Sequence, residues 1–135
     1  MACSCCSPNG AAAPGNAIDY FYWTIAAGAV NGNFFSAWNG NALGAALAEP
    51  NSTIFMPRGG LLRNLRLATP TGANVGADQT AFIRVNGINI FSATIAAGQH
   101  TGSSGASTNI VLLFDRVSLI ASTSLGPLIA SLELG

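Results

Sequence analysis

Two runs rich in β-branched and aromatic residues, 79–85 and 88–95, are separated only by Asn86 and Gly87. Asn-Gly supplies the two residues that readily take positive φ angles in a type I′ turn, whose twist matches that of two antiparallel strands. The pattern therefore predicts a β-hairpin over residues 79–95. Every fold open to this chain must contain that hairpin.

Short apolar runs recur along the chain between breaks rich in Gly, Pro and Asn. Runs of this length bounded by turn residues are typical of strands. Residues 42–48 predict only a short helical turn or an irregular loop, and residues 98–109 a loop of small residues. Besides the hairpin, strands are expected over residues 18–26, 34–38, 53–56, 61–68, 110–114, 116–122 and 128–134. About eight short antiparallel strands without a long helix predict an all-β fold, a jelly-roll β-sandwich.

Two of these strands show which side faces the core. Within residues 61–68, Leu65 and Leu67 alternate with Asn64 and Arg66, so the leucines are expected on the buried face. In the last run, 128–134, the apolar residues at every second position share one face. These residues are Leu128, Ala130, Leu132 and Leu134. This run is expected to be the closing strand of the sandwich.

The first sixteen residues differ from the rest of the chain. They hold all three cysteines, Cys3, Cys5 and Cys6, among Gly, Pro and Ala residues that bury little apolar area. Such a segment cannot offset the entropy lost on ordering, so it is expected to be flexible on its own. We therefore divide the 135-residue chain into a flexible N-terminal connector, residues 1–16, and a single jelly-roll sandwich, residues 17–135.

The cysteines are the only residues of the chain whose pattern suggests reactive or metal-binding chemistry. A zinc site would lack a fourth ligand, because the only histidine, His100, lies far away in the sequence. Bridges within Cys3, Cys5 and Cys6 would close rings too tight for normal disulfide geometry. We expect no metal or other cofactor, and we assign the three cysteines to a connector that docks non-covalently or forms disulfides between subunits. An unreacted terminus is the alternative.

The charge content points to a surface that contacts other protein. Only 7% of the residues are charged, against about 25% in a typical soluble protein, and the formal net charge is zero. Near-zero net charge favours self-association over dispersion. We interpret the chain as an assembly subunit whose partners are copies of itself, with other surface proteins as a second kind of partner. The alternative is a neutral monomer covered by Ser, Thr and Asn.

Nucleic acids and membranes are not expected partners. The five arginines are spread among strand residues without an excess of positive charge, whereas phosphate binding requires basic clusters. The longest stretch of low polarity, residues 21–30, falls short of the ~20 apolar residues of a membrane span. The N-terminus has no recognisable signal peptide. A location outside the cell would then require a signal already removed or release by lysis.

No motif indicates an enzyme. His100 is the only conventional base, and the nearby Ser103 and Ser104 do not lie in a G-x-S-x-G elbow. Asp115 and Arg116 are expected to be a charge pair at a strand end. The aromatic residues of the first part of the chain are expected in the core or in an interface, with a sugar-binding platform as the alternative. These residues are Tyr20, Phe21, Tyr22, Trp23, Phe34, Phe35 and Trp38.

A Cys-x-Cys-Cys arm ahead of a low-charge β body, with Phe114-Asp-Arg-Val-Ser-Leu119 before a closing apolar strand, resembles the bacterial endospore appendage (Ena) family. The resemblance implies that the arm reaches a neighbouring subunit and is locked there by disulfides. It also implies that strands of adjacent subunits pair into a helical fibre. This chain departs from the pattern because residues 7–135 contain no cysteine to receive the arm.

A second resemblance rests on Arg84-Val-Asn-Gly-Ile88 followed by Asp115-Arg-Val-Ser-Leu119, which is similar to tumour-necrosis-factor-like jelly rolls. These include the trimeric tips of collagen-like exosporium proteins, although this chain has no Gly-X-Y stalk. We therefore expect a structural subunit of an extracellular or spore-surface filament. The alternatives are a trimeric tip and a sugar- or receptor-binding module.

Overall fold

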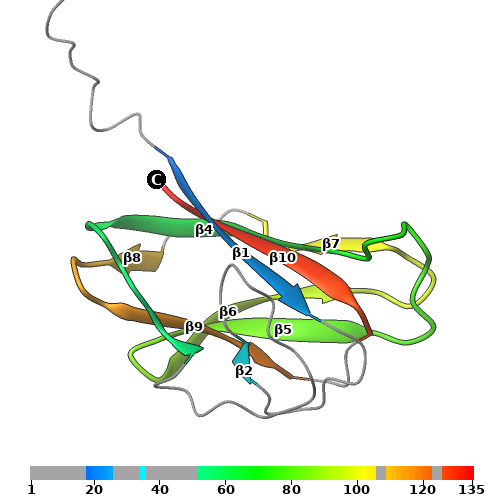
Figure 1. Ribbon diagram of the computed structural model, residues 1–135. Coiled ribbons are helices and arrows are strands. Elements are labelled where there is room, and N and C mark those ends of the chain that lie inside the picture. The colour runs from blue at the N-terminus through cyan, green and yellow to red at the C-terminus, as the bar shows by residue number, and fades with distance from the viewer. Residues whose placement is uncertain (1–17, 26–33, 36–51, 106–108, 123–125) are drawn as a thin grey trace, which may run out of the picture.

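Two five-stranded antiparallel sheets lie face to face in the computed structural model, which describes residues 18–25, 34–35, 52–105, 109–122 and 126–135 (Figure 1). Sheet 1 has the order β1 (Asp19–Ile25), β10 (Leu128–Leu134) and β4 (Gly60–Ala68), and β4 then pairs with both β7 (Thr101–Ser103) and β8 (Asn109–Val111). In sheet 2, β2 (Phe34–Phe35) and β3 (Ile54–Phe55) pair with β9 (Arg116–Ala121), which is followed by β5 (Gln79–Val85) and β6 (Ile88–Ile95). The expected all-β sandwich is confirmed.

The core lies between the two sheets and follows from the alternation of the strands. In β1, the side chains of Phe21, Trp23 and Ile25 are buried while their neighbours face outward. The four apolar residues of β10 that were expected on one face are all buried, and so are Leu65 and Leu67 of β4. Because side chains alternate between the faces of a strand, the opposite side of sheet 1 is left for polar and functional residues.

The hairpin predicted from Asn86 and Gly87 is confirmed. The φ angles of these residues are 52° and 85°, as a type I′ turn requires. Strands β5 and β6 pair along their whole length, with one register shift between Ile83 and Arg84. The turn also contacts β9, because Asn86 N donates a hydrogen bond to Arg116 O at 2.8 Å.

Two expectations about the later part of the chain were wrong. The strand expected over residues 110–114 ends at Val111, because Leu112 N donates to the Asp115 carboxylate and Asp115 N donates to Leu112 O, which closes a turn. The loop expected over residues 98–109 contains β7, which pairs with the end of β4. The small polar residues of β7 show no strand pattern in the sequence, because this strand is short and forms only by pairing with β4.

Gly102 allows β7 to close one edge of the sandwich. A Cβ atom at this position would lie 2.0 Å from Thr94 O, a backbone atom of β6. Gly102 is in register with Leu67 of sheet 1, whereas Thr94 belongs to sheet 2. The absence of a side chain therefore lets the two sheets meet at this edge.

Several expectations concern residues outside the described ranges. These are the connector over residues 1–16, the helical turn or loop over 42–48, and the last residues of the strands expected over 18–26 and 34–38. The boundary between connector and sandwich therefore stays a prediction.

Candidate functional site

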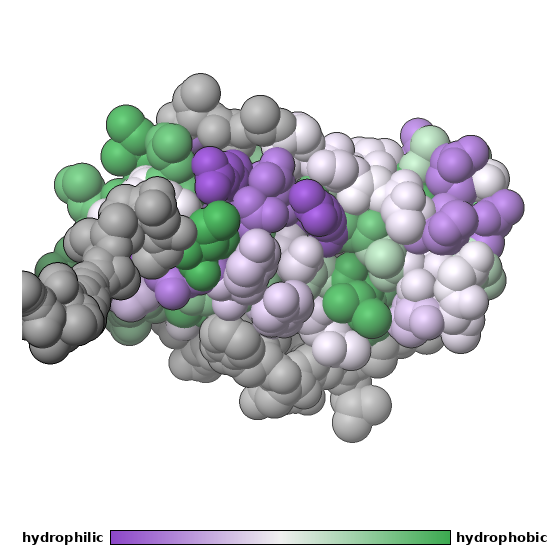
Figure 2. Space-filling model, turned by 90° about the horizontal axis from the view of Figure 1, so that it is seen from above, coloured by the Kyte–Doolittle hydropathy of each residue, from purple (hydrophilic) through white to green (hydrophobic). Residues whose placement is uncertain are grey.

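The outer face of sheet 1 presents side chains from four strands in cross-strand rows. One row runs through Tyr22, Ser131, Arg66 and Ser103, which are paired in register from β1 to β7. The next row runs through Thr24, Ile129, Ala68 and Thr101. Figure 2 looks onto this face, where hydrophilic residues gather across the middle and hydrophobic ones lie on either side. The rows form the floor and walls of the first candidate site.

A groove of about 490 Å³ lies in these rows, and we call it the sheet 1 groove. Its lining is Tyr22, Arg66, Leu67, Ala68, Thr101, Gly102, Ser103, Ile129 and Ser131. The hollow arises because the small residues Ala68 and Ser131 lie between larger side chains of the outer face. Its volume is within the roughly 300–1,000 Å³ of sites that hold small organic molecules.

An exposed tyrosine pair borders the groove. The rings of Tyr20 and Tyr22, two residues apart on β1, are stacked with centroids 6.3 Å apart and an angle of 24° between their planes. Both side chains face outward because Phe21 and Trp23 point into the core. A stacked, exposed aromatic pair beside a hollow offers a flat apolar contact area with polar hydroxyl groups.

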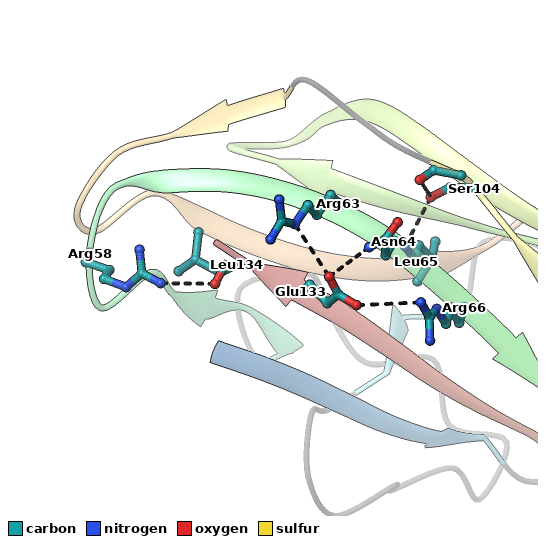
Figure 3. A network of polar contacts seen from close by, with 9 residues as sticks. Arg58, Arg63, Asn64, Leu65, Arg66, Ser104, Glu133 and Leu134 are labelled. Atoms are coloured by element: carbon teal, nitrogen blue, oxygen red, sulfur yellow. Dashed lines mark hydrogen bonds and ion pairs between the residues drawn. The ribbon is translucent and has the colours of Figure 1, made fainter. Parts of the chain in front are cut away.

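A buried carboxylate organises the arginines next to the groove (Figure 3). Glu133 accepts a hydrogen bond from Asn64 Nδ2 at 2.8 Å, and its oxygens lie 3.5 Å from Arg63 Nε and 3.8 Å from Arg66 Nη2. The side chain of Glu133 is only 11% exposed, whereas that of Arg66 is 65% exposed. Glu133 thus holds Arg66 at the rim of the groove by electrostatic attraction rather than by a hydrogen bond.

A backbone irregularity of β4 brings these groups together. Asn64 has a φ angle of 53°, and the register between β4 and β10 shifts between Ser131 and Glu133. A bulge of this kind re-aims the side chains of a strand, and Asn is among the residues that tolerate a left-handed conformation. As a result the side chains of Arg63, Asn64 and Arg66 all point toward Glu133 (Figure 3).

Replacing Glu133 with alanine is expected to lower the free energy of unfolding by about 1–3 kcal/mol, because Asn64 loses its hydrogen-bond acceptor and the half-buried Arg63 loses its ion-pair partner. The matched control is Asp19→Ala. Asp19 binds Arg58 at 3.0 Å, but its side chain is 45% exposed, so this change should cost less than about 1 kcal/mol. Urea denaturation of the two variants checks the difference. Equal losses would contradict the organising role given to Glu133.

A second candidate surface lies at the end of the sandwich where β1 begins. Six large apolar side chains of this end are each more than half exposed, and we call them the apolar end: Phe55, Ile88, Ile110, Leu112, Leu113 and Phe114. They come from β8 and the turn that follows it, from β3 and from the tip of the β5–β6 hairpin. Hydrophobic residues are visible at the left end of the face in Figure 2. Exposed apolar patches of this kind mark interaction sites.

Phe114 is held outward in a strained conformation. Its φ angle is 69°, which is unfavourable for a bulky residue, and 70% of its surface is exposed. The surroundings enforce this conformation, since Phe114 N donates to Met56 O at 2.9 Å and Met56 N donates to Asp115 O at 2.9 Å. Strain of this kind is maintained at functional positions more often than elsewhere.

The carboxylate of Asp115 fixes the same turn. It accepts hydrogen bonds from Asn86 Nδ2 at 2.9 Å and from Leu112 N at 2.8 Å. The bond from Asn86 contributes most, and the bond from Leu112 adds to it, so that the pKa of Asp115 is lowered below its ordinary value of 3.8. The turn, the hairpin tip and β3 are therefore tied into one rigid unit.

A pH titration should report the contribution of Asp115. Because its pKa is lower in the folded state, the stabilisation is complete above pH 3.8 and is lost as the pH falls through the folded-state pKa. In NMR spectra, the amide proton of Leu112 should shift with a midpoint below 3.8. The Asp115→Asn variant should lack this transition. A midpoint above 3.8 would contradict the assignment.

The remaining residues expected at sites are placed as follows. Cys3, Cys5 and Cys6 lie outside the described residues, as does Trp38. The His100 ring contacts Asn74 Oδ1 at 3.3 Å, while the hydroxyl groups of Ser103 and Ser104 accept bonds from the backbone N–H groups of Gly105 and Leu65. These serines thus stabilise the loop through hydrogen bonds with the backbone.

One expectation about a charge pair was wrong. Among the ion pairs of the described residues, none joins Asp115 to Arg116, because the carboxylate is taken up by Asn86 and Leu112. Trp23 has no exposed surface, which confirms its expected place in the core and excludes it from the alternative sugar-binding platform. The bulge at Asn64 and the exposed Phe114 turn were missed, because neither leaves a recognisable pattern in the sequence.

Within the described ranges, no three or more His, Cys, Asp or Glu side chains cluster in a way suited to a metal ion. The same residues include no helix with the length and hydropathy needed to span a membrane. No protein-family model matches the chain, and no curated protein is significantly similar to it.

Proposed function

We propose that this chain is a non-enzymatic structural subunit that assembles with copies of itself into an extracellular or spore-surface filament. The observation that carries the proposal is the apolar end, because its six side chains are exposed on a rigid, hydrogen-bonded frame. At roughly 100 Å² each, they offer on the order of 600 Å² of apolar surface, the upper range for the largest patch on a monomer. Association would remove this surface from water.

The topology and the charge support the same proposal. The chain crosses repeatedly between the two sheets, and the strand orders β1-β10-β4-β7 and β2-β9-β5-β6 place strands side by side that are distant in sequence. These orders support a jelly roll, a fold common in capsids and other assemblies. The zero net charge provides no repulsion between copies. In this proposal, residues 1–16 link subunits through Cys3, Cys5 and Cys6, with other surface proteins as further possible anchors.

Negative-stain microscopy of the full chain tests the proposal. We expect filaments at neutral pH and moderate salt. Dispersed particles of monomer size under both oxidising and reducing conditions would overturn it, and discrete trimers would select the trimeric-tip alternative instead. Electrophoresis with and without reductant tests the cysteines separately, since a ladder that collapses with reductant would place them between subunits.

A sugar-binding module is a second candidate function, favoured by one observation. The stacked Tyr20 and Tyr22 border the sheet 1 groove, whose rim also carries Arg66 and the hydroxyl group of Ser103. Aromatic faces and hydroxyl groups are the contacts that sugars use. Glycan-array binding that is lost in Tyr22→Ala, with folding retained, would favour this function. Absence of binding by the folded wild-type chain would count against it.

A further inference from the structure

We propose that the turn Leu112–Phe114 of one copy docks into the sheet 1 groove of a second copy, so that subunits join head to tail. This inference rests on the proposed function, because it names the contact through which assembly occurs. Its elements are a protruding apolar turn and an unfilled hollow on the same chain.

The two surfaces cannot satisfy each other within one molecule. Val111, which leads into the turn, pairs with Gly60 at the start of β4, whereas the groove is lined by Arg66, Leu67 and Ala68 at its end. At about 3.3 Å per residue, the two sites lie roughly 20 Å apart along the strand. The turn is also fixed by Met56 and Asp115. Only another molecule can bring a turn to the groove.

The size and chemistry of the two surfaces match. A hollow of about 490 Å³ is large enough for a few apolar side chains, and its walls include the exposed side chains of Ile129 and Tyr22. The turn carries the negative charge of Asp115, and the cation at the groove rim is Arg66, whose side chain is exposed although it lies 3.8 Å from Glu133. Opposite charges at the rim would fix the orientation of docking.

The turn is preorganised for binding. A loop that must be ordered on association loses affinity, and a loop already held in its bound conformation does not. Phe114 is held in its strained conformation by its hydrogen bond to Met56, the residue after β3, and by the Asp115 carboxylate, which fixes the turn. This accounts for the retention of an unfavourable φ angle at an exposed aromatic residue.

A contact between two different surfaces has a defined consequence for assembly. Such heterologous contacts leave a free turn at one end of every open complex and a free groove at the other. They therefore generate open filaments, or rings where the two ends meet. The six residues of the apolar end offer somewhat less than the ~800 Å² that each partner buries in a standard interface. The contact is therefore expected at the low end of the size range of stable interfaces.

Mixing two defective variants tests the contact directly. The turn variant Leu113→Asp/Phe114→Asn should fold, because Asn tolerates the left-handed φ angle better than Phe. The groove variant Ser131→Tyr fills the hollow with a residue that favours strands. Each variant keeps the surface that the other lacks. Thr71→Asp, in an exposed turn after β4, is the control for added charge.

Sedimentation velocity is measured for each chain with and without reductant, after circular dichroism has confirmed folding. We expect polymers from the wild type and from Thr71→Asp, monomers from each defective variant, and a species of twice the monomer mass from their equimolar mixture. Polymers from either variant, or only monomers in the mixture, would overturn the inference while leaving the proposed function intact. Monomers from the wild type itself would overturn the proposed function. Loss of sugar binding in a still polymeric Ser131→Tyr would assign the groove to a sugar and likewise overturn the inference.

Discussion

Gly102→Ala is expected to lower the free energy of unfolding by about 3 kcal/mol or more, because the new Cβ atom would lie 2.0 Å from Thr94 O. The neighbour is a backbone atom of β6, so no side chain can rotate away. Either β7 must leave β4 or the two sheets must separate at this edge. The groove wall formed by Gly102 would be lost together with the stability.

The matched control is Gly76→Ala. No heavy atom lies within 4 Å of the position that the Cβ atom of residue 76 would take. This substitution should change the free energy of unfolding by less than about 1 kcal/mol, with stabilisation expected from the reduced freedom of the unfolded chain. Urea denaturation of both variants provides the comparison. A Gly102→Ala variant as stable as Gly76→Ala would contradict the sheet closure described above.

Trp23→Ala is expected to cost about 3–5 kcal/mol, since it leaves a large cavity between the sheets. Trp23 is the largest fully buried side chain in the described part of the chain and has no exposed surface. Single domains are stable by only about 5–15 kcal/mol, so this change should remove much of the stability of the sandwich. Thermal unfolding followed by circular dichroism measures the effect.

Tyr22→Ala is the neighbouring control, because Tyr22 lies on the same strand with its side chain facing outward. It should cost about 1 kcal/mol or less. Trp23→Phe should cost less than Trp23→Ala for a second reason: Trp23 Nε1 is buried without a hydrogen bond among the described residues, so removing it offsets part of the lost packing. Equal effects of Tyr22→Ala and Trp23→Ala would contradict the assigned orientation of β1.

Local patterns in the sequence were sufficient to predict most of the strands. The Asn86-Gly87 turn encodes its own geometry, and the alternation of Leu128 to Leu134 reports directly which side is buried. Both signals depend only on residues close together in the chain. Elements whose existence depends on distant partners were missed, as β7 shows, because its three small residues form a strand only beside β4.

The candidate sites were harder to predict than the strands. The sheet 1 groove combines Tyr22, Arg66, Ser103 and Ile129, which are distant in sequence and meet only through strand register. Residues 110–114 were interpreted as a strand because they form a nearly continuous apolar run. The structure instead places Leu112, Leu113 and Phe114 outside, since Asp115 turns the chain after Val111. An apolar run alone does not distinguish a core strand from an exposed contact surface.

Self-assembly is the central claim, and sedimentation velocity of the wild-type full chain over a hundredfold concentration range tests it most directly. We expect the mean sedimentation coefficient to rise steadily with concentration and to reach no limiting value, because each added subunit leaves a free turn and a free groove. A single boundary of monomer mass at every concentration, with and without reductant, would contradict the account.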